Sequence, residues 1–244
     1  MNDHDSRNRH YSQSQIWSQD GGSGLPDAPT AAEAGVSERL GFIRKVYSLF
    51  FVATLFAIGG VMIGFAVPDV MILIARHPII TLMLMMGGVI GAQAVRHVPG
   101  VNLAAFFAFT TFTGVVISPF IYYVSVTNPS SIFQAGVLTV GIFGGLTVYA
   151  FLSKRDFSFM RGMLFVGLIV VLLAGLLNVL ALGSTGLGFA IACAALLLFS
   201  GYVLYDTSNI IRRYPTNEYV AGAMDLYLDA FNIFLALLRI LNRR

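Results

Sequence analysis

Seven long apolar stretches, separated by short polar breaks, organise the sequence from residue 46 onward. The breaks carry prolines, glycines and charged residues, which are typical of turns. Runs of this length predict helices that cross a bilayer, because a backbone exposed to lipid must satisfy its own hydrogen bonds. A membrane β-barrel would show shorter, alternating strands instead. The stretches cover residues 46–67, 79–95, 101–124, 132–152, 162–182, 187–211 and 219–241.

Residues 1–36 differ from the rest of the chain, since they are rich in Ser, Asp, Asn, Gly and Gln and hold no long apolar run. This composition is typical of disorder. We therefore expect a disordered polar tail over residues 1–36 and one seven-helix transmembrane domain over residues 37–244. The first apolar run begins near Val46 and is too long for the core of a signal peptide, so none is expected.

The composition agrees with a membrane protein: 57% of the 244 residues are apolar and 11% are charged, with a mean hydropathy of +0.77. Soluble domains carry about 25% charged residues. The basic residues lie mostly between the apolar runs, where they set topology and do not form a nucleic-acid footprint. The lipid bilayer is therefore the expected partner, and nucleic acid is not.

The positions of Lys and Arg predict a cytoplasmic N-terminus. In that orientation the outer loops hold only Arg76, apart from the basic C-terminus. That C-terminus lies outside if the seventh stretch spans the membrane and inside if the stretch re-enters, and we favour spanning. The inner segments then hold Arg39, Arg44, Lys45, Arg96, Lys154, Arg155, Arg161, Arg212 and Arg213.

Small residues recur at a spacing that lets membrane helices approach each other closely. Pro119 follows Ser118 inside the third stretch, where it removes a backbone donor and is expected to kink the helix. The glycine pairs with this spacing are Gly60 and Gly64, Gly87 and Gly91, and Gly141 and Gly145.

Three acidic residues lie inside apolar stretches: Asp206 near the end of the sixth, and Asp225 and Asp229 in the seventh. A carboxylate at the centre of a membrane helix costs about 2.5 to 3.5 kcal/mol. A leucine or phenylalanine returns only about 0.3 to 0.6 kcal/mol. The seventh stretch is thus marginally able to insert alone, and we expect it inside the bundle with its polar face covered.

The polar residues of the seventh stretch follow one helical stripe, since they are spaced by four and three residues. With a cytoplasmic N-terminus, Asp206 lies shortly before the last inner loop and Asp229 shortly after it, so the two reach a similar depth. Arg96 is the nearest candidate cation at that level. The stripe consists of Asp225, Asp229, Asn232, Ala236 and Arg239.

Two carboxylates in apolar surroundings cannot both ionise freely and are expected to share a proton. Such a pair can sense pH, and when doubly ionised it offers the hard oxygen ligands that calcium prefers. Asp206, Asp229 and Arg96 are therefore the candidate pH-sensing and ion-gating residues. The two aspartates would bind calcium transiently, with Asp225 and Asn232 as a secondary polar stripe.

Each of these residues also has a plain structural interpretation. Asp206 and Asp229 could simply join two helices by hydrogen bonds, Asp225 could be solvated near a helix start, and Arg96 could only set topology. No permanently bound cofactor is expected. The histidines lie in the tail or in loops without metal-ligand spacing, at His4, His10, His77 and His97.

Three segments, in order along the chain, resemble the Bax inhibitor-1 (transmembrane BAX inhibitor motif) family over about residues 40–242. The second and third are the more specific. The first is Thr-Gly-Val-Val-Ile-Ser-Pro-Phe at 113–120, the second is Phe-Leu-Ser-Lys-Arg-Asp-Phe-Ser at 151–158 with Gly162 and Leu164, and the third runs from Tyr205-Asp206 through Leu226-Tyr227-Leu228-Asp229 to Leu238-Arg239.

This resemblance implies seven membrane helices with the last at the centre, and a link to calcium leak and cytoprotection. The paired aspartates of the family match Asp206 and Asp229, and a cationic residue proposed to engage them matches Arg96. Eukaryotic members often carry a Lys- and Asp-rich C-terminal tail, whereas this chain stops at Arg244, which puts regulation through such a tail in doubt. The short form resembles bacterial members, so an inner-membrane location is expected.

The aspartate pair and the family resemblance are compatible with three functions. We expect a pH-sensitive calcium leak channel, with calcium and protons as its ligands. The first alternative is a non-transporting interaction or stress-protection protein that binds other membrane proteins. An intramembrane aspartyl protease is disfavoured, because residues 226–229 read Leu-Tyr-Leu-Asp and such proteases carry Gly-x-Gly-Asp. The protein is therefore not expected to be an enzyme.

Overall fold

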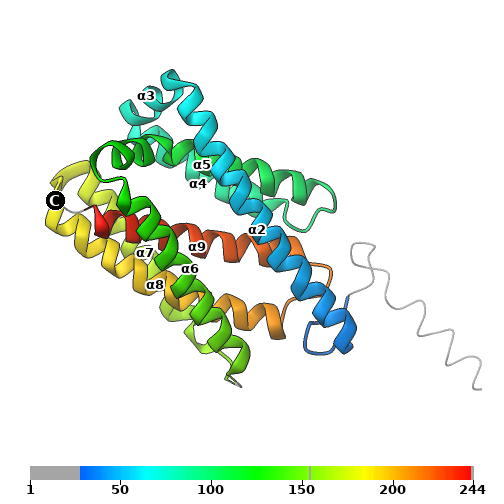
Figure 1. Ribbon diagram of the computed structural model, residues 1–244. Coiled ribbons are helices and arrows are strands. Elements are labelled where there is room, and N and C mark those ends of the chain that lie inside the picture. Colours follow the sequence, from blue (N-terminus) through cyan, green and yellow to red (C-terminus); the bar gives the residue numbers. More distant parts are fainter. Residues whose placement is uncertain (1–27, 154, 243–244) are drawn as a thin grey trace, which may run out of the picture.

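The computed structural model describes residues 28–153 and 155–242, and this part of the chain contains eight α-helices (Figure 1). Two short irregular turns flank the helix α7: a 3₁₀ turn at Ser158–Met160 and a wider π-helical turn at Asn178–Leu182. The α-helices are α2 (Val36–Ala66), α3 (Pro68–Arg76), α4 (Pro78–Ala94), α5 (Val101–Thr127), α6 (Ser130–Leu152), α7 (Arg161–Leu177), α8 (Thr185–Arg212) and α9 (Tyr219–Leu241).

Five of the described helices are long and apolar enough to cross a membrane: α2, α5, α6, α7 with its flanking turns, and α8. The pair α3 and α4, bent by 101°, counts as a sixth span if its two parts are taken together. The protein is therefore an all-helical, multi-pass membrane protein. The prediction of seven spans is confirmed in part: up to six candidate spans are found among the described residues, and α9 is not one of them.

The helix α3 is a departure from the sequence prediction, which assigned residues 68–78 to a break. Pro68 stands at the start of α3 and Pro78 at the start of α4. Proline suits the first helical position, because its missing N–H would have no helical partner there. The apolar residues after Pro68 thus form a helix, and the chain turns only at His77.

The helix α9 lies at the centre of the described bundle, between α2, α6 and α8 (Figure 1). Thirteen of its 23 residues are buried, whereas α7 buries only Leu164. The central position follows from its polar residues, because carboxylates facing lipid would be far more costly than carboxylates facing other helices.

The helices α2 and α5 cross closely at glycines. A Cβ atom on Gly60 would lie 2.0 Å from the carbonyl oxygen of Thr111, and one on Gly114 would lie 2.0 Å from the carbonyl oxygen of Ala57. Packing at Gly60 is thus confirmed, and Gly64 likewise packs against Ser118. The same prediction was wrong for the other glycine pairs, where an added Cβ would meet nothing within 4 Å in the described chain: Gly87, Gly91, Gly141 and Gly145.

The helix α5 continues through Pro119 without a break in its assignment. Proline cannot donate to the carbonyl group four residues earlier, which here belongs to Val115. The hydroxyl group of Ser118 donates to that carbonyl oxygen instead, at 2.7 Å. The side chain beside the proline therefore satisfies the acceptor that the proline leaves free.

Residues 28–36, the described part of the segment predicted to be a disordered tail, have a defined structure. Residues 1–27 lie outside the described residues, but residues 30–34 form a turn. The amide of Ala31 donates to the carbonyl oxygen of Tyr214 at 2.9 Å, and the amide of Thr216 donates to that of Pro29 at 3.1 Å. This turn is therefore bound to the loop between α8 and α9, and Ala31 is fully buried.

The segments predicted to be cytoplasmic meet at one end of the bundle, which we call the inner end. His97 after α4 pairs with Glu218 before α9, at 2.9 Å from Nδ1 to Oε1. Asp156 between α6 and α7 pairs with Arg213 after α8, at 2.8 Å. With the turn at Ala31, four segments far apart in sequence are joined there.

Candidate functional site

Asp206 of α8 and Asp229 of α9 lie together inside the bundle. Their side chains are 9% and 3% exposed, and the two carboxyl groups lie within hydrogen-bonding range of each other. Two ionised carboxylates have no donor between them, so this contact becomes a hydrogen bond only when one of them carries a proton. The arrangement therefore suits a proton held between α8 and α9.

The surroundings of the aspartate pair are sparse in donors. The Asn209 side chain, one turn further along α8, lies within hydrogen-bonding range of Asp206. Oδ2 of Asp229 is buried and has no hydrogen-bond partner among the described residues. A buried acceptor left unpaired costs about 1 to 3 kcal/mol. A proton or a cation at this oxygen would remove that cost.

Asp225, one turn before Asp229, is held by residues outside α9. The hydroxyl group of Tyr214 donates to Oδ2 of Asp225 in a short hydrogen bond, and the Gln93 side chain lies within hydrogen-bonding range of it. Burial, together with the Asp225 carboxylate, raises the pKa of the Tyr214 phenol, so this group stays protonated and remains a donor. Asp225 is thus partly buried and bound, and it interacts electrostatically with Asp206.

Arg96 lies on the Asp225 side of the site. Its Nη1 donates to Oε1 of Gln93 at 3.0 Å and its Nε donates to Nε2 of His97 at 2.9 Å. Its charge acts on Asp225, and within the described ranges it forms no ion pair with either aspartate of the central pair. Engagement of that pair by Arg96 stays a prediction.

The C-terminal part of the predicted polar stripe takes no part in the cluster formed by the aspartates and Arg96. Asn232 donates from Nδ2 to the carbonyl oxygen of Leu228, in its own helix, at 2.8 Å. Ala236 is buried and Arg239 is exposed. The site is therefore confined to the half of α9 nearer the inner end.

Several residues of this region were missed by sequence reasoning, namely Tyr214, Gln93, Glu218 and His97. They lie in or next to loops, where no periodicity indicates which partner a side chain meets.

The hydrogen bond from Arg213 holds the pKa of Asp156, between α6 and α7, below its usual range. Both members of that pair are well exposed, so it contributes little to stability.

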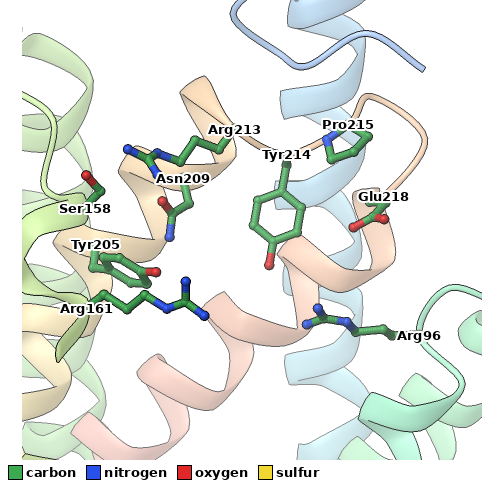
Figure 2. A pocket seen from close by; sticks show the side chains of 9 residues that line it. All are labelled: Arg96, Ser158, Arg161, Tyr205, Asn209, Arg213, Tyr214, Pro215 and Glu218. Carbon is green, nitrogen blue, oxygen red and sulfur yellow. The ribbon is translucent and has the colours of Figure 1, made fainter. Parts of the chain in front are cut away.

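A cavity of about 320 Å³ opens beside the aspartates at the inner end (Figure 2). Its lining includes Asn209, which contacts Asp206, and Tyr214, which bonds to Asp225. A single side chain therefore separates Asp206, and likewise Asp225, from a cavity that opens at the surface of the bundle.

The described residues include no group of three or more His, Cys, Asp or Glu side chains placed to hold a metal ion. Calcium takes six to eight oxygen ligands when it is firmly bound. The Asp206 and Asp229 carboxylates with the Asn209 amide supply fewer than that.

These features define a multi-pass helical membrane protein with a buried pair of aspartates between its last two helices. The sequence model of the family described as "Inhibitor of apoptosis-promoting Bax1" matches residues 39–244. The chain therefore belongs to the Bax inhibitor-1 family.

Relatives of this chain occur in bacteria, animals and viruses. An uncharacterized membrane protein of Vibrio cholerae is 44% identical over 138 residues, which cover 56% of this chain and 61% of that relative. Protein lifeguard 4 of Mus musculus is 32% identical, over 86% of this chain and 88% of its own length. The Golgi anti-apoptotic protein of Vaccinia virus (strain Lister) is 31% identical, over 87% and 90%.

Proposed function

We propose that this protein is a pH-sensitive calcium leak channel, gated by a proton that Asp206 and Asp229 share. The observation that supports this is the direct contact of the two buried carboxyl groups between α8 and α9. A protonated pair joins the two helices by a hydrogen bond and carries one negative charge at most. A fully ionised pair repels itself and attracts a divalent cation.

Protons and calcium would compete for the same oxygens under this proposal, and calcium is the transported ion, with no resident cofactor. Oδ2 of Asp229, buried without a partner among the described residues, is the atom most in need of either ligand. A route from the inner end to the pair would pass through the cavity lined by Asn209 and Tyr214.

A leak of this kind is tested with the full chain in proteoliposomes loaded with a calcium indicator. We expect calcium entry above that of empty liposomes, with a rate that changes between about pH 5 and about pH 8. A single titrating pair permits a change of up to about tenfold per pH unit. Entry no faster than in empty liposomes at any pH would remove the channel.

The names of the relatives favour a second candidate, a stress-protection protein that acts by binding other membrane proteins. One relative is named an anti-apoptotic protein, and the family description names an inhibitor of apoptosis. These names describe protection and not a reaction, so we propose a non-enzymatic role in either case. Absence of flux from the proteoliposomes would leave this candidate in place.

We also propose that α4 with α3, and the central helix α9, complete seven spans in an inner membrane, with the N-terminus in the cytoplasm. The joining of four basic or polar segments at the inner end supports this orientation. A reporter enzyme active only outside the cytoplasm should therefore be active when fused after Arg244 and inactive when fused after Asp156. Activity in the reverse pattern would overturn the orientation, and activity at neither site would show that α9 re-enters.

A further inference from the structure

The cavity at the inner end, which we call the inner pocket, is rich in guanidinium groups. Arg96 follows α4, Arg161 begins α7 and Arg213 follows α8, so three separate elements each contribute one arginine to its lining. Figure 2 shows the guanidinium groups of Arg96 and Arg161 pointing toward one another across the pocket, with the hydroxyl group of Tyr214 between them. Like charges placed in this way repel each other unless an anion lies between them.

The positive charge of the inner pocket is only partly compensated. Arg213 is paired with Asp156. Glu218, the one acidic residue of the lining, accepts a hydrogen bond from Nδ1 of His97. Nε2 of that ring accepts from Arg96, so the ring is uncharged and Glu218 keeps its negative charge. Among the described residues, the Arg96 guanidinium group donates to the neutral side chain of Gln93 and to the ring of His97, and its charge also acts on Asp225. The guanidinium group of Arg161 forms no hydrogen bond or ion pair with any residue in the described ranges.

The other groups around the pocket are also suited to an oxyanion. Ser158 and Tyr205 line it with hydroxyl donors, and Asn209 offers an amide. Arg161 lies near the N-terminal end of α7, and this end of a helix carries partial positive charge. Guanidinium groups bind phosphate oxygens through pairs of parallel hydrogen bonds, which a lysine cannot provide.

We propose that the inner pocket binds a phosphate group between Arg96 and Arg161, supplied either by a free phosphate anion or by the headgroup of an anionic lipid. A volume of about 320 Å³ accommodates a tetrahedral oxyanion with room for part of what it is attached to. The position of the pocket, at the inner end of a membrane bundle, is within reach of both sources.

The phosphate site would act on the aspartates through residues that belong to both. Tyr214 lines the pocket and donates to Asp225, and Arg96 lines it and acts on Asp225. An anion that engages these two donors would weaken their hold on Asp225. If the proposed calcium leak is correct, the anion would also offset the positive charge of the arginines that a calcium ion meets in the inner pocket. The binding itself does not depend on the leak.

Binding is tested on the full chain purified in detergent, by calorimetric titration with inorganic phosphate and by native mass spectrometry with phosphatidic acid and phosphatidylcholine. We expect saturable binding of one phosphate group. Arg161→Gln should weaken it about tenfold or more, as loss of a charge-assisted hydrogen bond implies. Arg44→Gln, which removes an exposed positive charge from α2 outside the pocket lining, should leave it unchanged.

The results distinguish the sources and can overturn the site. Binding of inorganic phosphate identifies a free anion, whereas retention of phosphatidic acid alone identifies a lipid headgroup. Tyr205→Phe, which removes one hydroxyl group and no charge, should weaken binding less than Arg161→Gln does. No saturable binding of either probe, or equal weakening by Arg161→Gln and Arg44→Gln, would overturn the proposal whether or not the protein conducts calcium.

Discussion

Calcium entry into proteoliposomes is expected to lose its dependence on pH when Asp229 is replaced by Asn. The amide cannot ionise, yet its NH₂ group can still donate to the Asp206 carboxylate, so the contact between α8 and α9 no longer needs a shared proton. Asp206→Asn should act in the same way, because the proton belongs to the pair and not to one residue. The rate in either variant should stay within about twofold across the range where the wild type changes up to about tenfold per pH unit.

Asp69→Asn is the matched control for these two variants. Asp69 lies in the first turn of α3 and is exposed, so its replacement changes the same charge away from the pair. The control should keep the pH dependence of the wild type. If Asp229→Asn or Asp206→Asn also keeps it, the gate lies elsewhere even though the protein conducts calcium. Arg96→Ala then becomes the informative variant, because the charge of Arg96 acts on Asp225.

Gly60→Ala is expected to destabilise the bundle strongly. The new Cβ would lie 2.0 Å from the carbonyl oxygen of Thr111 and 3.0 Å from the amide nitrogen of Val115. Both atoms belong to the backbone of α5, so no side-chain rotation relieves the clash, and α2 must move away from α5. Overpacking of this kind costs about 1 to 3 kcal/mol and occasionally more. The midpoint of thermal unfolding in detergent should fall by several degrees.

The comparison of glycines makes this prediction specific. Gly141→Ala should leave the unfolding midpoint nearly unchanged, because a Cβ there meets nothing within 4 Å in the described chain. Gly64→Ala should have an intermediate effect, since its Cβ would meet the side chain of Ser118, which can move at the cost of its bond to Val115. Equal midpoints for Gly60→Ala and Gly141→Ala would contradict the close crossing of α2 and α5.

The sequence determined most of the helices. A long apolar run in lipid must satisfy its own backbone hydrogen bonds, and a helix is the structure that does so within one segment. The predicted stretch 219–241 coincides with α9, and 187–211 differs from α8 (Thr185–Arg212) by one or two residues at each end. The start of α2 at Val36 was missed, because its first turns are polar and hydropathy detects contact with lipid and not helical structure. The helix α3 was missed because the prolines on both sides of it were interpreted as one break.

The sequence also determined which residues of α9 share a face, since a period of 3.6 residues fixes that without any neighbour. It could not determine which helix each residue of the face would meet. Only the tertiary structure decided that Asp229 faces Asp206 while Asp225 faces Tyr214 and Gln93. It also decided that Gly60 packs against α5 while Gly141 packs against nothing in the described chain. These contacts join residues far apart in the chain, and they depend on how whole helices cross, which local spacing does not encode.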